Sequence, residues 1–353
     1  MTRDNLLDRV RHGEPVRGVD LSSLDLTGAD LSGAVFEDVR FPTALGSALL
    51  KESSLIGCDL GGCDASGADL HLANLYRCKL DGARFAEAKL VAASFAECEA
   101  DDASFANVEA PIATWVKTSL RRATFAGANL DRANLLEIEA DAATFANANL
   151  QKATLYRADL TTADLAAANL VLTTLVEAKL GAKSFAGARL FRTQFMRSDL
   201  RGASFAGVDC AECNFMGADL RGASFDDATG PMCFFGGAKL DGARLAKGDF
   251  RRANFEKAEL AGTVFAEAVL EEAYFGHAKA AGAIFAGAKL READFSHANV
   301  TAAELTGASL FRTKFHMAKR ERTKLPELAG WLGDDEELAR VEAWAPAIQG
   351  EGR

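Results

Sequence analysis

The sequence predicts an all-β solenoid in which the chain turns a corner every five residues. Every fifth residue from Leu55 to Phe315 is usually large and apolar: of these 53 central positions, 26 are Leu and 18 are Phe. A second series two places earlier, from Ser53 to Thr313, holds 35 Ala and 6 Cys. A helix requires a period of 3.6 and a flat strand a period of 2, so a period of five fits neither. It fits a four-sided coil of 20 residues with one large and one small side chain pointing inward on each side.

The two kinds of large residue alternate around this coil. Central positions ending in 5 are mainly Phe, and those ending in 0 are mainly Leu. A four-sided coil would therefore stack Phe on two opposite faces and Leu on the other two, which fills a narrow interior without voids. Neighbouring coils are expected about 4.8 Å apart, the usual strand spacing. Six of the seven Cys lie in the small inward series and Cys210 is a central residue, so we expect buried fillers rather than ligands or nucleophiles.

The repeat units resemble those of pentapeptide-repeat proteins. Ala68-Asp69-Leu70, Ala128-Asn129-Leu130 and Ala218-Asp219-Leu220 carry the A(D/N)LXX pattern. The resemblance covers about residues 16–319 and implies a right-handed quadrilateral β-helix, here of about 14–15 four-sided coils with short helical caps at both ends. The first repeats, centred on Leu21 to Phe41, are in a different phase. We expect a corner irregularity or small loop near 42–47.

The two ends are expected to be capped, because an open coil exposes apolar stacks and unpaired strand edges. Segment 1–15 is predicted to be a cap with a helix from Arg3 to His12, begun by Thr2 and ended by Gly13. Segment 320–353 is predicted to be a cap or a dimerisation segment. It would hold helices from Pro326 to Leu332 and from Asp334 to Ala345, the second with Leu338, Val341 and Trp344 as apolar contacts. In some pentapeptide-repeat proteins a C-terminal helix mediates dimerisation, so a homodimer through these helices is one expectation.

Composition excludes several classes of function. The chain has 50 Asp and Glu against 40 Lys and Arg, a net charge of −10, so direct nucleic-acid binding is not expected. No apolar stretch approaches the length of a membrane span, and the first residues hold no signal-peptide core. We therefore expect a cytoplasmic location with no membrane insertion, although export by a non-classical apparatus stays open.

Catalytic machinery is not recognisable. The sequence has no phosphate loop, HExxH motif or GxSxG elbow, so we predict no enzyme, no catalytic residue and no cofactor. His277 and His297 share one outward position a coil apart and His316 follows on the next coil. We assign no metal to them, and whether they bind one stays undecided. Lys183 occupies a small inward position, where we expect it to snorkel or to distort a corner.

One face carries the candidate interaction surface. This face has one central position per coil, at 55, 75 and so on in steps of 20. The residue after each of these positions is mostly apolar over a length of about 38 Å. We call this column the ridge: Ile56, Tyr76, Val116, Leu136, Tyr156, Val176, Met196 and Met216. The adjoining column alternates in charge and we call it the charge ladder: Arg77, Glu97, Lys117, Glu137, Arg157, Glu177 and Arg197. Long apolar strips tend to mark binding sites, whereas the alternative is that the ridge only stacks successive coils.

Two functions remain open. The first is a non-enzymatic protein–protein interaction scaffold or adaptor with an unidentified protein partner. The opening from Leu6 to Leu21 resembles pentapeptide modules of bacterial type VI secretion loci, which gives one setting. The second is a DNA mimic that binds DNA gyrase or topoisomerase and protects it from inhibitors, as some pentapeptide-repeat proteins do. The best surface for mimicry is an acidic group: Glu99, Asp101, Asp102, Glu139, Asp141 and Asp159.

Overall fold

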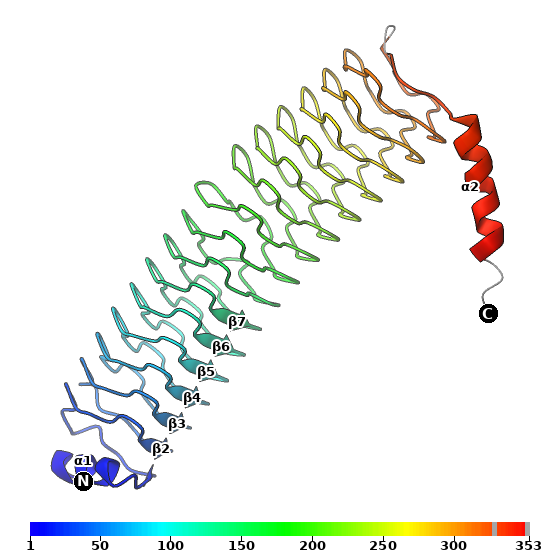
Figure 1. The fold of residues 1–353 in the computed structure, drawn as a ribbon. Helices are drawn as coiled ribbons and strands as arrows, with labels where there is room; N and C mark the ends of the chain where they lie inside the picture. Colours follow the sequence, from blue (N-terminus) through cyan, green and yellow to red (C-terminus); the bar gives the residue numbers. More distant parts are fainter. Residues whose placement is uncertain (327–329, 350–353) are drawn as a thin grey trace. The chain divides into compact units, whose positions relative to one another are not determined.

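The computed structural model describes residues 1–326 and 330–349, and for 344–349 it describes the backbone alone. The chain divides into two compact units, Met1–Asp199 and Leu200–Arg353. Each unit is built of stacked coils, which Figure 1 traces in sequence order.

The first unit begins with α1 (Arg3–Arg11), as the sequence predicts. Thr2 caps it by accepting a hydrogen bond from the Asn5 N–H, and Leu6 is fully buried. The helix ends at His12, and Gly13 turns the chain away with a φ of +68°, a conformation that glycine adopts without strain. The Arg3 guanidinium donates to the Thr27 carbonyl at 3.0 Å. This contact holds α1 against the first coils.

Successive coils of the first unit pair as parallel strands. A seven-stranded sheet runs in sequence order, so each strand hydrogen-bonds to the equivalent strand of the next coil (Figure 1). The strands are β1 (Val16–Arg17), β2 (Val35–Glu37), β3 (Ser54–Ile56), β4 (Asn74–Tyr76), β5 (Ser94–Ala96), β6 (Thr114–Val116) and β7 (Asn134–Leu136). On the other sides, successive coils pair through single β-bridges, and a new bridge begins every five residues along the chain. Examples are Asp59 with Lys79, Asp64 with Arg84 and Asp69 with Lys89. The fold is thus the predicted β-solenoid with a step of 20 residues.

The phase change is resolved at one corner. Asp20 pairs with Arg40, a step of 20, whereas Asp25 pairs with Ala44, a step of 19. The side that ends at Ala44 is therefore one residue short, and Phe41 stays buried. The irregularity is a one-residue deletion at a corner, not a loop.

The core follows the predicted alternation. Phe85, Phe105 and Phe125 stack face to face along one side, with ring centroids 5.2 and 4.8 Å apart. Phe95 and Trp115 stack along the opposite side at 5.2 Å, and rings from the two sides meet edge to face. All seven cysteines are buried. Burial raises the pKa of Cys63 to about 12, as expected of a filler and not of a nucleophile.

Lys183 does not snorkel as expected, because its charged end bonds to backbone oxygens instead of reaching solvent. The residue is 8 % exposed, and its ammonium donates to the backbone carbonyls of Ala163 and Thr161. Burial penalises the charged form and lowers the pKa of this group. The buried cation is thus satisfied by backbone oxygens.

The second unit repeats the same architecture, with three exceptions in one column of Leu residues. Its coils pair with a step of 20, as in Asn254 with Tyr274. The Leu column is interrupted at three successive coils by Cys210, Gly230 and Phe250, all inward. A Cβ on Gly230 would lie 2.7 Å from the Phe250 ring and 3.0 Å from the Cys210 sulfur. The Phe250 ring therefore fills the space that Gly230 leaves.

The C-terminal end corrects several expectations. Coil pairing continues to Lys324, which bridges Glu304. The expected helix from Pro326 to Leu332 is wrong at its end, because Leu332 pairs as a strand with Lys314; 327–329 lie outside the described residues. The Trp331 ring meets Phe315 edge to face at 5.8 Å and covers the end of the Phe stack.

The last helix also differs from the expectation. It is α2 (Glu336–Gln349), and Asp335 caps it by accepting from the Leu338 N–H at 3.0 Å. It therefore starts after Asp335 rather than at Asp334. Leu338 and Val341 are 43 % and 61 % exposed, so they are not the packing contacts that the sequence suggested. The side chain of Trp344 lies outside the described part. Neither helix among the described residues is long and apolar enough to cross a membrane.

Candidate functional site: the ridge and its neighbours

The ridge is held in register by the sheet of the first unit. Ile56 on β3 pairs with Tyr76 on β4, and Val116 on β6 pairs with Leu136 on β7. Ile56 is 39 % exposed, Tyr76, Val116, Leu136, Tyr156 and Met196 are half-buried, and Val176 is buried. Met216 belongs to the second unit, where it is exposed. The column is thus continuous from Ile56 to Met196 but less exposed than the sequence suggested.

The charge ladder explains part of this shielding. The Arg77 guanidinium lies 4.8 Å from the Tyr76 ring centre and binds Glu97 at 2.8 Å. Tyr156 repeats the arrangement with Arg157 at 4.9 Å and Glu177. Each arginine therefore covers one face of a ridge tyrosine while its charge is neutralised by the next coil.

Glu177 is the best-connected member of the charge ladder. It binds Arg157 at 2.8 Å and Arg197 at 2.9 Å. These hydrogen bonds hold the pKa of Glu177 below its ordinary value. The surface beside the ridge is consequently ordered and close to neutral.

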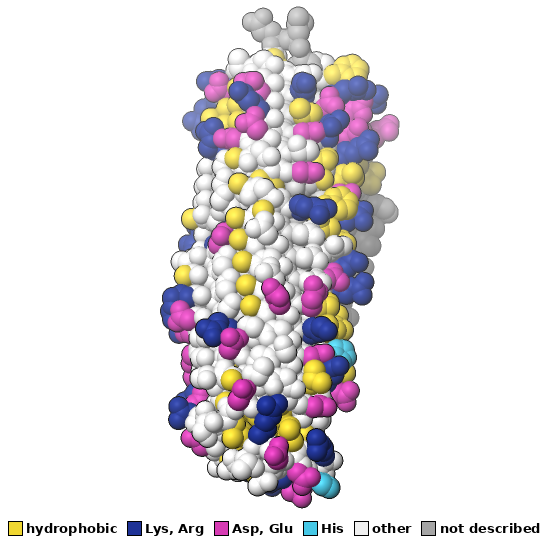
Figure 2. Space-filling view, turned by 90° about the vertical axis from the view of Figure 1, so that its left-hand side faces the viewer, with side chains coloured by type: hydrophobic (Ala, Val, Ile, Leu, Met, Phe, Trp, Pro, Cys, Tyr) yellow, Lys and Arg dark blue, Asp and Glu magenta, His cyan; other side chains and the backbone are white. Residues whose placement is uncertain are grey.

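The acidic group is mostly neutralised. Arg122 binds Asp102 at 2.6 Å, Lys179 binds Asp159 at 2.8 Å, and Arg121 lies against both Glu139 and Asp141. Asp101 accepts from the Ser119 hydroxyl and from the Arg121 N–H. On the face in view in Figure 2, acidic and basic side chains lie beside one another. The structure thus intersperses these carboxylates with cations instead of presenting an unbroken anionic surface.

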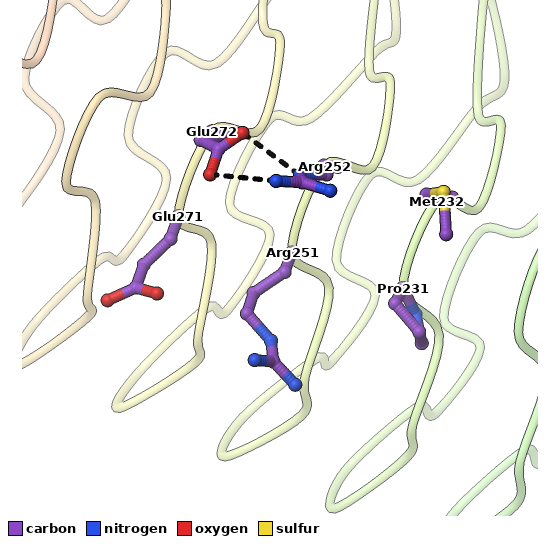
Figure 3. A pocket seen from close by; sticks show the side chains of 6 residues that line it. All are labelled: Pro231, Met232, Arg251, Arg252, Glu271 and Glu272. Carbon is purple, nitrogen blue, oxygen red and sulfur yellow. Dashed lines mark hydrogen bonds and ion pairs between the residues drawn. The ribbon is translucent and has the colours of Figure 1, made fainter.

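A second apolar surface was missed by the sequence reasoning. It lies at the corner after central positions such as 70, 110 and 170, where Leu72 and Ile112 are each 49 % exposed and Leu172 is also exposed. In the second unit, Met232 occupies the equivalent corner beside Pro231. There a shallow pocket continues over Arg251, Arg252, Glu271 and Glu272 (Figure 3). The position of these residues in the repeat could have identified them as exposed. The second residue after a central position is a turn residue with positive φ, as at Leu72 and Ile112.

The histidine cluster gains a partner from α2. The His277 and His297 rings stack at 4.8 Å, and His316 meets His297 edge to face at 5.5 Å. Glu342 reaches both His297 and His316. The sequence suggested the three histidines but not Glu342. Because α2 lies outside the periodic region, the repeat does not indicate which residues of α2 lie against the coils.

Comparison with known proteins identifies the repeat. The model of the family described as pentapeptide repeats matches eight times, at residues 17–41, 45–82, 113–137, 143–181, 193–229, 233–271, 268–307 and 288–319. No curated protein matches the chain.

Among solved structures, HetL, a pentapeptide repeat protein involved in heterocyst differentiation regulation in the cyanobacterium Nostoc sp. PCC 7120, is 22 % identical. The match covers 94 % of each chain with a TM-score of 0.17. QnrB1, a plasmid-mediated fluoroquinolone resistance protein, is 20 % identical over 65 % of this chain and 98 % of its own, with a TM-score of 0.22. The family-model matches cover more than half of the sequence, and the coils have the five-residue side that such repeats require, so this chain belongs to the pentapeptide-repeat family.

Proposed function

We propose that this protein is a non-enzymatic interaction scaffold whose ridge binds a protein partner. One observation carries the proposal: an apolar column, which includes the small Ala96 and the buried Val176, runs from Ile56 to Met196. Paired coils fix it, and a neutralised charge ladder borders it. Apolar strips of this length tend to mark interaction sites. A pre-ordered surface also loses little conformational entropy on binding.

The setting we propose is bacterial and cytoplasmic, with a link to a type VI secretion system. This part rests on the resemblance of the opening segment from Leu6 to Leu21. The alternative is a DNA mimic that protects gyrase or topoisomerase. Mimicry requires a continuous anionic surface, and the ion pairs of Arg121, Arg122 and Lys179 with the acidic group favour the scaffold.

A homodimer through the C-terminal helices remains part of the proposal. Leu338 and Val341 lie three residues apart on α2 and are both exposed, which gives that helix an apolar face. Sedimentation of Val341→Asp beside the parent chain tests it. A parent dimer that becomes a monomer in the variant is expected, and a monomeric parent refutes this part.

Affinity capture from the host, read by mass spectrometry, tests the proposal. The ridge variant is Tyr156→Asp with Met196→Asp. The matched control is Ala146→Asp with Ala186→Asp, which occupies the same outward position on the opposite face, ten residues earlier. We expect a partner that the control retains and the ridge variant loses. Capture of gyrase or topoisomerase IV subunits regardless of the ridge mutation would favour mimicry instead.

A further inference from the structure

Three side chains from separate elements of the second unit converge beside α2. Glu342 of α2 lies 3.1 Å from His297 Nε2 and 3.3 Å from His316 Nε2. The three ligand atoms all lie within 4.8 Å of one another. The two histidines come from neighbouring coils, so the cluster joins the helix to the end of the solenoid.

We propose that His297, His316 and Glu342 bind a divalent transition metal ion of the zinc class. Imidazole nitrogen and carboxylate oxygen are ligands that zinc accepts at about 2.0–2.2 Å, and a tetrahedral site then has ligand atoms about 3.3 Å apart. The two separations to Glu342 already match that value. Three protein ligands leave the fourth position to water.

The ligands are held in place by their surroundings. His316 is 3 % exposed, and its ring stands edge-on to His297. The His277 ring stacks against the His297 ring. Glu342 is set by the start of α2, where Asp334 accepts from the Met317 N–H at 2.7 Å and lies 3.6 Å from Arg320. Metal binding then requires two rearrangements: the imidazole nitrogens must come closer together, and the Asp335 N–H must move away from His316 Nδ1.

The proton on His316 determines what metal binding changes. The Asp335 N–H donates to His316 Nδ1 at 3.0 Å, so the metal-free neutral ring carries its proton on Nε2, facing Glu342. A metal takes the Nε2 lone pair, and the proton moves to Nδ1. The Asp335 N–H then loses its acceptor. Metal binding therefore ties Glu342 to the coils while releasing the hydrogen bond at the start of α2.

Zinc titration of the chelator-stripped full chain by calorimetry tests this site. We expect one zinc ion per chain, with affinity at least tenfold weaker in Glu342→Gln and in His297→Ala. Glu342 is on an exposed helix, so Glu342→Gln should fold normally. His277→Ala is the matched control, because this ring stacks on His297 without reaching Glu342, and it should keep most of the affinity.

A second readout follows from the proton shift. Amide exchange at Asp335 should quicken when zinc is added to the parent chain and stay unchanged in Glu342→Gln. Absence of zinc binding to the parent, or equal affinity in parent and Glu342→Gln, would overturn the proposal. The result is independent of ridge binding, since the two surfaces share no residue.

Discussion

Gly230→Ala tests the packing of the second unit, because two effects of known size oppose each other there. Replacing glycine by alanine restricts the unfolded chain and stabilises a protein by about 0.4–1 kcal/mol where the backbone allows it. At Gly230 the new methyl group would lie 2.7 Å from the Phe250 ring and 3.0 Å from the sulfurs of Cys210 and Cys233. Overpacking of this kind costs about 1–3 kcal/mol. We therefore expect a net loss of about 1.3 kcal/mol, the difference between the midpoints of these two ranges.

Urea denaturation followed by circular dichroism measures this loss, and hydrogen exchange localises it. The Gly230 amide, which donates to the Asp249 carbonyl at 2.8 Å, should exchange faster. Phe250→Leu removes the clashing ring atoms, so the double variant should be more stable than the sum of the single losses predicts. Gly46→Ala is the control, because its nearest contact would be 3.9 Å away. A Gly230→Ala chain as stable as the parent, or additive losses in the double variant, would refute the packing argument.

Three further predictions concern single side chains. Burial lowers the pKa of Lys183, so the parent should gain stability as the pH rises from 7 toward about 10, where the unfolded lysine also loses its proton. Lys183→Met should show no such gain. Parallel pH profiles of the two chains in thermal melts would contradict this prediction. The Trp115 indole N–H has no hydrogen-bond partner among the described residues, so Trp115→Phe should change the free energy of unfolding by less than about 1 kcal/mol. Phe95→Ala, which removes a whole ring, should lower it by about 3–5 kcal/mol. Equal losses for the two variants in urea titrations would be the opposing result. The lowered pKa of Glu177 predicts that Glu177→Gln is slightly less stable than the parent at pH 7. This difference should fade as the pH falls below about 4.3 and through the lowered pKa of the folded state. A difference in stability that persists at acid pH would contradict the prediction.

The periodic part of the fold could be predicted because one rule repeats in every side of every coil. A five-residue period with a large and a small inward residue fixes the corner, the pairing step and the core at once. The same rule locates the buried Cys column and the one-residue change of phase at Ala44. It also marks Lys183 as an exception, because a long charged side chain stands where the pattern places a small one.

The remaining features depend on contacts that a period does not encode. Leu332 pairs as a strand with Lys314, and Trp331 covers the Phe315 ring; no repeat signals either contact. Part of the burial of the ridge arises from arginines that fold over Tyr76 and Tyr156, which a column of outward positions cannot show. Glu342 joins the histidines only because α2 lies against the coils.

The most direct test of the central claim compares stability and binding in one variant. Tyr156→Asp with Met196→Asp removes the Tyr156 contact with Arg157, which at an exposed site contributes about 0.5–1 kcal/mol, together with part of the apolar surface. If the ridge is a binding surface, the variant should melt within a few degrees of the parent and lose partner capture. A large fall in melting temperature would show instead that the ridge stacks the coils, and capture that survives the mutation would place the partner elsewhere.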